Sequence, residues 1–303
     1  MIVLPWLWIP LTIFAALAQT VRNTAQRRLV DNLGTLGATL VRFLYGMPFL
    51  MLWLGLVIGI GGDAIPPLTT GFAAWVLVAA LSQMTGTALL LRAMAERGFA
   101  IGLVYSKSEV IQVALFSVIF LDERLSLLAA FAIGLATLGV ILLSPRPAGS
   151  VLARSWANPA ALFGLASGSA FAISVVGYRG ATLALDAGSP FLGAAGTLFC
   201  SQLTQTVLLG AWLLARTPSV VLGALREWPL SLFAGLAGAS ASAANVTALA
   251  LESASNVRTL ILIEVLFTYV VSLRIFREAI SRRELAGIAL VVLGVGIVVA
   301  TSR

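Results

Sequence analysis

The sequence predicts an all-α integral membrane protein with ten transmembrane helices, arranged as two inverted five-helix repeats. Three observations lead to this prediction: an apolar composition, ten long apolar segments and an internal repeat. Apolar residues make up 60% of the 303 residues and charged residues only 10%, with a mean hydropathy of +1.03. A soluble domain carries about a quarter charged residues, so the composition excludes a soluble fold of this size.

Ten segments are long and apolar enough to span a bilayer, which requires about 20 residues per helix. We predict spans at residues 5–25, 35–60, 71–94, 99–120, 126–144, 159–183, 190–215, 229–251, 255–273 and 284–301. Polar or helix-breaking residues separate them, among them Gly61-Gly62 after the second span, Asp122-Glu123-Arg124 after the fourth and Pro145 after the fifth. The loops are too short for a separate soluble domain.

The two halves of the chain resemble each other at a nearly fixed offset. Three pairs are 155 positions apart: Glu109 with Glu264, Glu123 with Glu278, and Gly139 with Gly294. Each half therefore holds five spans, and an odd number of spans inverts the second half in the membrane. Inverted repeats are typical of secondary transporters, whose substrate site lies near the midplane between the halves. We expect a first repeat at 1–147, a linker at 148–158 and a second repeat at 159–303.

Arginine positions predict the orientation, because cytoplasmic loops carry an excess of basic residues. Thirteen arginines are assigned to the ends of odd-numbered spans and the loops that follow them: Arg22, Arg27, Arg28, Arg92, Arg97, Arg146, Arg154, Arg216, Arg226, Arg274, Arg277, Arg282 and Arg283. Three fall on the other side: Arg124, Arg179 and Arg303. With ten spans, this bias places both chain ends outside the cytoplasm.

Two related motifs carry a resemblance to a known family. They are Leu121-Asp122-Glu123-Arg124-Leu125-Ser126 followed by Gly134 and Gly139, and Arg277-Glu278-Ala279-Ile280-Ser281 followed by Gly287 and Gly294. With Arg42-Phe43 early in the second span, they resemble the drug/metabolite transporter (DMT) superfamily, EamA type, over essentially the whole chain. The resemblance implies a metabolite transporter whose central cavity is walled by spans one, three, four, six, eight and nine. Such proteins are usually drawn with both termini cytoplasmic, whereas the arginine count indicates the reverse.

The fourth span contains the densest group of polar side chains. Tyr105, Glu109 and Gln112 lie at i, i+4 and i+7, so a continuous helix presents them on one face, which we expect to line the cavity. Lys107 lies about 160° from Glu109 on such a helix, so each needs another partner. A bridge from Lys107 to Glu264 across the repeat interface is our expectation, either as part of the substrate site or as a purely structural contact.

Other polar residues within spans complete the predicted substrate site. They are Glu264 and Arg258 in span nine, Gln83 in span three, Asn245 in span eight, Gln19 in span one and Tyr178 in span six. Ionisable residues inside a membrane are costly and mark functional sites by default. The uncharged residues have an alternative role in interhelical hydrogen bonds. Glu109 and Glu264 are the candidates for carrying a coupling proton.

The predicted function is secondary transport, as an exporter or exchanger, of a small polar organic metabolite by alternating access. The ionisable groups expected within spans are Arg42, Lys107 and Arg258 against two glutamates, which favours an amino acid or similar zwitterion. A lipid or lipid-linked sugar flippase and a membrane-embedded lipid enzyme are the alternatives. The chain has no histidine, one cysteine and no Walker motif, so we expect no enzyme activity, no cofactor and no metal.

The remaining expectations concern partners and location. We expect membrane lipids, the small-molecule substrate and a coupling proton as partners, and no nucleic acid, because the basic residues lie between apolar segments without interleaved aromatic residues. The protein is expected to be a monomer or homodimer in a bacterial inner (plasma) membrane.

Overall fold

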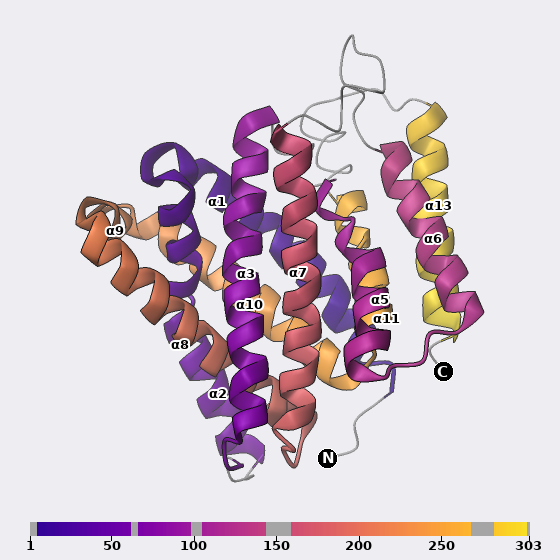
Figure 1. Cartoon of the computed structure of the whole chain (residues 1–303), viewed down its shortest axis with the longest axis horizontal. Helices are drawn as coiled ribbons and strands as arrows, with labels where there is room; N and C mark the ends of the chain where they lie inside the picture. Colours follow the sequence, from indigo (N-terminus) through magenta and orange to yellow (C-terminus); the bar gives the residue numbers. More distant parts are fainter. Residues whose placement is uncertain (1–4, 62–65, 98–104, 144–158, 268–281, 302–303) are drawn as a thin grey trace.

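The computed structural model describes residues 5–61, 66–97, 105–143, 159–267 and 282–301, and every regular element within them is a helix. The helices are α1 (Trp8–Leu44), α2 (Met47–Gly61), α3 (Thr70–Arg97), α5 (Glu109–Leu121), α6 (Leu127–Leu143), α7 (Pro159–Ala184), α8 (Pro190–Arg216), α9 (Pro218–Arg226), α10 (Trp228–Leu251), α11 (Ala254–Leu260) and α13 (Arg282–Thr301) (Figure 1). The fold is therefore all-α, as predicted.

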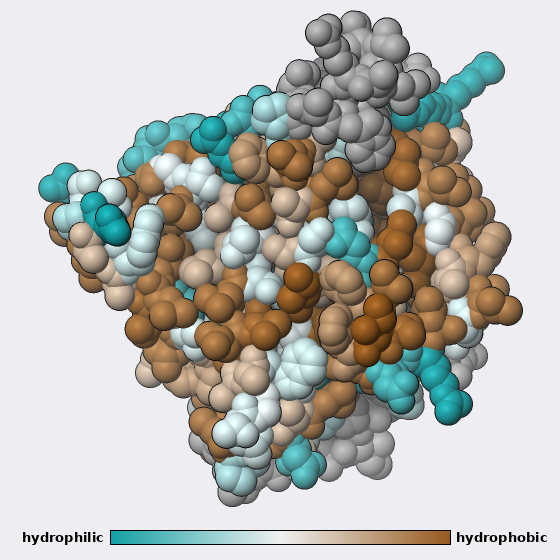
Figure 2. All heavy atoms as spheres, in the orientation of Figure 1, coloured by the Kyte–Doolittle hydropathy of each residue, from teal (hydrophilic) through white to brown (hydrophobic). Residues whose placement is uncertain are grey.

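The helices have the length and surface of a membrane protein. Five helical stretches of the described chain are long and apolar enough to cross a bilayer, and α5, α6 and most of α13 are shorter apolar helices. Large apolar side chains point outward, including Leu127 and Ile60 at 91% and 82% exposure. Figure 2 shows such residues spread over the middle of one face, with hydrophilic residues mainly toward its edges. The protein is an integral membrane protein with an apolar outer surface.

Three helix pairs make the most extensive contacts: α3 with α7, α1 with α10, and α6 with α13. The first and third pairs run side by side in Figure 1. Glycines permit this close approach, because a Cβ on Gly177 would lie 2.9 Å from the backbone nitrogen of Ala79, and one on Gly139 would lie 2.7 Å from the carbonyl oxygen of Gly287. Small residues at membrane helix interfaces act in this way.

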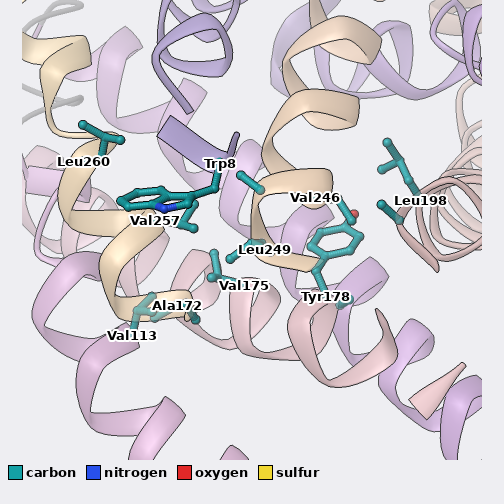
Figure 3. Packing of buried hydrophobic residues seen from close by; sticks show 14 of the residues in the cluster. Trp8, Val113, Ala172, Val175, Tyr178, Leu198, Val246, Leu249, Val257 and Leu260 are labelled. Atoms are coloured by element: carbon teal, nitrogen blue, oxygen red, sulfur yellow. The ribbon is translucent and has the colours of Figure 1, made fainter. Parts of the chain in front are cut away.

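An apolar cluster packs beside the polar centre of the bundle. It joins Trp8 of α1, Val175 and Tyr178 of α7, Leu249 of α10 and Val257 of α11, all of them buried (Figure 3). Tyr178 belongs to both environments, because its ring packs in this cluster while its hydroxyl hydrogen-bonds to Ser201 Oγ at 2.9 Å. The apolar packing thus fixes the position of side chains that line the cavity described below.

The first predicted loop, residues 26–34, is wrong. Helix α1 continues through it, because Leu29 and Leu33 are buried and the exposed side carries the i,i+4 ion pair Arg27–Asp31 at 2.9 Å. The backbone leaves helical geometry only at Gly34, with φ 68° and ψ 174°, a conformation that glycine adopts readily. Arg22, counted above as a loop residue, is consequently buried inside the bundle.

Helix α9 was not predicted. Proline at its first position and the non-helical Thr217 before it begin a new helix directly after α8. Its nine residues are too short to span a bilayer, so the count of long apolar segments could not include it. The predicted linker 148–158, the start of span four and the end of span nine lie outside the described residues.

Candidate functional site

Both central glutamates follow a break in their helix. Before α5, the backbone nitrogens of Ser108 and Val110 bond three residues back, to Tyr105 and Lys107 at 3.3 and 3.2 Å. After α11, the nitrogen of Glu264 bonds to the carbonyl of Ile261 at 3.0 Å, again three residues back. These tighter turns rotate the following side chains away from their positions on a continuous α-helix.

Helix α7 packs directly onto the first break. A Cβ on Gly168 would lie 2.5 Å from Ser108 Oγ and 2.9 Å from the carbonyl oxygen of Ser106. Only a residue without a side chain fits there, so Gly168 brings the α7 backbone against the turn that carries Lys107.

The expected bridge from Lys107 to Glu264 is present. Lys107 Nζ lies 2.5 Å from a carboxylate oxygen of Glu264, and both side chains are buried. A second bridge runs in the opposite sense. It joins Nη1 of Arg258, in the last turn of α11, to the carboxylate of Glu109, the first residue of α5, at 3.6 Å. Each glutamate is therefore paired with a cation of the other segment.

The two glutamates differ in how fully they are hydrogen-bonded. Glu264 accepts bonds from Lys107, from the Gln19 amide at 2.9 Å and from the Asn23 amide at 3.2 Å. Arg22 reaches it indirectly, because its guanidinium donates to Asn23 Oδ1 at 2.8 Å. Glu109 has the 3.6 Å contact to Arg258, which is too long for a good hydrogen bond.

These groups surround a polar cavity at the centre of the bundle. Its walls come from α1, α3, the turn before α5, α7, α10 and α11. The empty volume is about 540 Å³, but the centre of a water molecule can occupy only about 30 Å³ of it. The side chains therefore close around the site in this conformation, and a substrate requires some of them to move apart.

Arg42 projects into the cavity from the second part of α1. Its guanidinium donates to Thr87 Oγ1 at 2.9 Å and to Ser242 Oγ at 3.4 Å, on α3 and α10. The Gln83 amide is oriented so that both of its ends form hydrogen bonds. Its oxygen then lies 2.5 Å from Arg42 Nη2, and its nitrogen lies 2.8 Å from Ser174 Oγ. All these partners are neutral, and Arg42 Nε is buried without a partner.

Most of the predicted site residues lie around this cavity. Seven line it: Gln19, Gln83, Lys107, Glu109, Tyr178, Asn245 and Arg258. Glu264 contacts two of these lining residues, Gln19 and Lys107. Asn245 Oδ1 is buried without a hydrogen-bond partner.

Tyr105 and Gln112 do not line the cavity, contrary to expectation. The helix-face argument fails because the chain is not a continuous helix between residues 105 and 109. The same break allows Lys107 and Glu109 to line one cavity despite their unfavourable spacing. Arg22 and Arg42, absent from the predicted site, both line it. The sequence could have indicated Arg22, because Gln19, Arg22 and Asn23 lie at i, i+3 and i+4 and so share one face of a helix.

A further ion pair closes the end of the bundle at the carboxyl end of α5. Arg179 Nε on α7 donates to Glu123 at 2.9 Å, and its Nη1 donates to the carbonyl oxygen of Leu249 at the end of α10. The second oxygen of Glu123 accepts from the backbone nitrogen of Ala254, the first residue of α11, at 3.1 Å. Glu123 therefore ties four helices together on this side of the cavity.

Comparison with known families now adds to this geometry. Residues 6–144 match the EamA-like transporter family. The match places this N-terminal segment in the drug/metabolite transporter superfamily. A search of curated proteins gives no significant match. A solved crystal structure aligns with a TM-score of 0.69 at 17% identity, covering 97% of this chain and 95% of the other, and at that identity the likeness concerns the fold alone. The family match indicates a membrane transporter of small molecules.

Proposed function

We propose that this EamA-like protein is a secondary transporter that carries a small, charged organic metabolite through its central cavity by alternating access. The observation that carries the proposal is the set of buried ionisable side chains around the cavity, held by two helix breaks. Discontinuous helices at the midplane are a recurring way to build substrate sites in secondary transporters. The polar lining of the cavity favours a water-soluble metabolite over a lipid or a lipid-linked sugar.

The proposed repeats are residues 1–147 and 159–303, joined by 148–158. An inverted repeat relates α1 to α7 and α3 to α10, so it exchanges the α1–α10 contact with the α3–α7 contact. These are two of the three most extensive contacts in the described chain. The third, between α6 and α13, joins the last helix of each proposed repeat. The packing thus supports a two-fold arrangement around the cavity. The proposed location is a bacterial plasma membrane.

The substrate site of this proposal comprises the lining residues Lys107, Glu109, Arg258 and Asn245, with Glu264 behind them. Without Arg22 and Arg42, this set offers two cations and two carboxylates, which suits a zwitterion such as an amino acid. Glu109 and Glu264 are the proposed acceptors of a coupling proton, since the chain contains no histidine.

Two measurements test the function. A metabolite library is first screened for compounds that raise the unfolding temperature of the purified protein, because a ligand that binds only the folded state stabilises it. The hits are then tested for uptake into proteoliposomes, with and without a pH gradient. Saturable uptake that exchange with internal substrate accelerates supports a transporter. Transfer of labelled lipid between leaflets, without uptake of any soluble hit, would indicate a flippase instead.

A further inference from the structure

Two arginines of the cavity have no carboxylate partner among the described residues. We propose that the guanidinium groups of Arg22 and Arg42 together bind the anionic groups of the substrate. The substrate is then a small organic dianion, either a dicarboxylate or a phosphate monoester. The proposal rests on the transport function above and names its substrate class. Neither arginine belonged to the site predicted from the sequence.

The two arginine side chains converge on one point of α10. A Cβ on Gly238 would lie 3.3 Å from Arg22 Cδ and 3.4 Å from Arg42 Cγ. The missing side chain at Gly238 therefore leaves space for both stems, one from each part of the kinked α1. Both residues then line the same cavity.

Neutral groups hold the two guanidinium heads, and the nearest carboxylates, Glu264 and Glu109, act on Arg22 only from beyond ion-pair distance. Arg42 donates to the hydroxyls of Thr87 and Ser242, and Arg22 donates to Asn23 Oδ1. The ion pairs of the described chain include neither arginine within 4.0 Å of a carboxylate. Arg42 Nε has no partner and the side chain is 97% buried. A guanidinium carries five N–H donors in a planar fork that matches an oxyanion.

The charge count of the cavity gives the charge of its ligand. Among the described residues at the cavity, four cations, Arg22, Arg42, Lys107 and Arg258, stand against two carboxylates, Glu109 and Glu264, so their net charge is 4 − 2 = +2. The sequence alone gave +1, because Arg22 was assigned to a loop. Buried charge without compensation is costly, and a dianion removes the excess. A zwitterion leaves the excess unchanged and a monoanion halves it.

Asn245 supplies a second feature of the ligand. Its Oδ1 is a buried acceptor without a donor, on the α10 wall of the same cavity. A hydroxyl group on the substrate provides such a donor. The favoured ligand is therefore a hydroxylated dianion, with its charged groups at the arginines and its hydroxyl at Asn245.

The test uses the full chain in detergent at neutral pH and low salt, with probes that differ mainly in charge. Succinate and glycerol phosphate are the dianions, monomethyl succinate the monoanion, alanine the zwitterion and putrescine the dication. We expect succinate or glycerol phosphate to raise the unfolding temperature most, and to bind more tightly than monomethyl succinate in calorimetry. Which dianion binds distinguishes a carboxylate site from a phosphate site.

Substitutions assign the binding to the two arginines. Arg22→Gln and Arg42→Gln should each weaken dianion binding roughly 30-fold or more, the loss typical of truncating one partner of a buried charged contact. Arg42→Lys keeps the charge but loses the planar fork, so it should fold and bind with intermediate affinity. Arg28→Gln is the matched control, because Arg28 lies on the same helix and is exposed; its affinity should equal that of the wild type.

Each failure has a distinct meaning. Binding of alanine or putrescine in preference to both dianions would overturn the dianion assignment while leaving the transport function standing. Equal affinity for succinate and its monomethyl ester would overturn the charge argument, and unchanged affinity in folded Arg42→Lys and Arg22→Gln proteins would overturn the role of the arginines. If no soluble compound binds or enters proteoliposomes, the proposed transport function itself fails.

Discussion

Replacing Lys107 by methionine tests whether the bridge across the repeat interface stabilises the fold, serves transport, or does both. Methionine has a similar length and removes the charge. The substitution leaves Glu264 buried at 0% exposure with two neutral donors, the amides of Gln19 and Asn23. Glu264 thereby keeps part of its hydrogen bonding and loses its direct cation.

The expected cost follows from this environment. Removing one partner of a buried ion pair destabilises a protein by about 3–5 kcal/mol. Because two amides still donate to Glu264, we expect the lower end, about 3 kcal/mol. Glu264→Gln removes the carboxylate charge that Lys107 pairs with, so the double variant with Lys107→Met should be more stable than the sum of the single effects predicts, by about 2 kcal/mol.

The assay combines unfolding in detergent with uptake into proteoliposomes. Arg92→Gln is the control, because its pair with Glu96 is exposed and worth about 0.5 kcal/mol or less. Lys107→Met should abolish uptake in the fraction that folds, and Lys107→Arg should impair it strongly. Additive stabilities within about 0.5 kcal/mol would show that Lys107 and Glu264 do not stabilise each other. Normal uptake by Lys107→Met would make the lysine a structural residue.

Three further predictions concern other parts of the molecule. A fluorescent reporter that matures only in the cytoplasm should stay dark at the C-terminus, and bright full-length fusions would contradict the arginine bias. Gly168→Ala should destabilise the protein by about 1–3 kcal/mol and reduce uptake, because its Cβ would overlap the turn before α5. Gly134→Ala is the control: a Cβ there has nothing within 4 Å, so this variant should be neutral or slightly stabilising in thermal unfolding. Glu123→Gln should lower stability by about 1–3 kcal/mol by weakening the bond from Arg179, whereas an unchanged unfolding midpoint would show that this contact does not hold the helices together.

The helices were predictable because hydrophobic length is a strong signal in a membrane protein. Apolar segments located α3, α7, α8 and α10 to within a few residues of their observed bounds. The connection after the first span was not predictable in this way. Its polar residues between 19 and 32 indicate a loop by composition, yet α1 buries Arg22, Asn23 and Gln26 against other helices. Composition does not show whether a polar stretch faces water or a polar cavity.

The site was predictable in its residues and less so in its geometry. Rare ionisable side chains within apolar spans identified Lys107, Glu109 and Glu264, since burying such groups is costly without a reason. Their angular relation was wrong because helix periodicity assumes α-helical hydrogen bonds, and the bonds before Glu109 run to the third residue. Short-range bonds of this kind depend on tertiary packing, here of Gly168 against the turn.

The repeat gives the two glutamates equivalent positions, but the sequence gives them different surroundings. Gln19 and Lys107, which donate to Glu264, correspond at offsets of 156 and 155 to Val175 and Leu262, which have no side-chain donor. The third donor, Asn23, corresponds to Arg179, which is paired with Glu123. Glu109 therefore lacks equivalents of two of the three donors to Glu264. Glu264 accordingly anchors the fixed side of the site. Glu109, with one long contact to Arg258, keeps the free acceptor capacity that a donor group on a substrate requires.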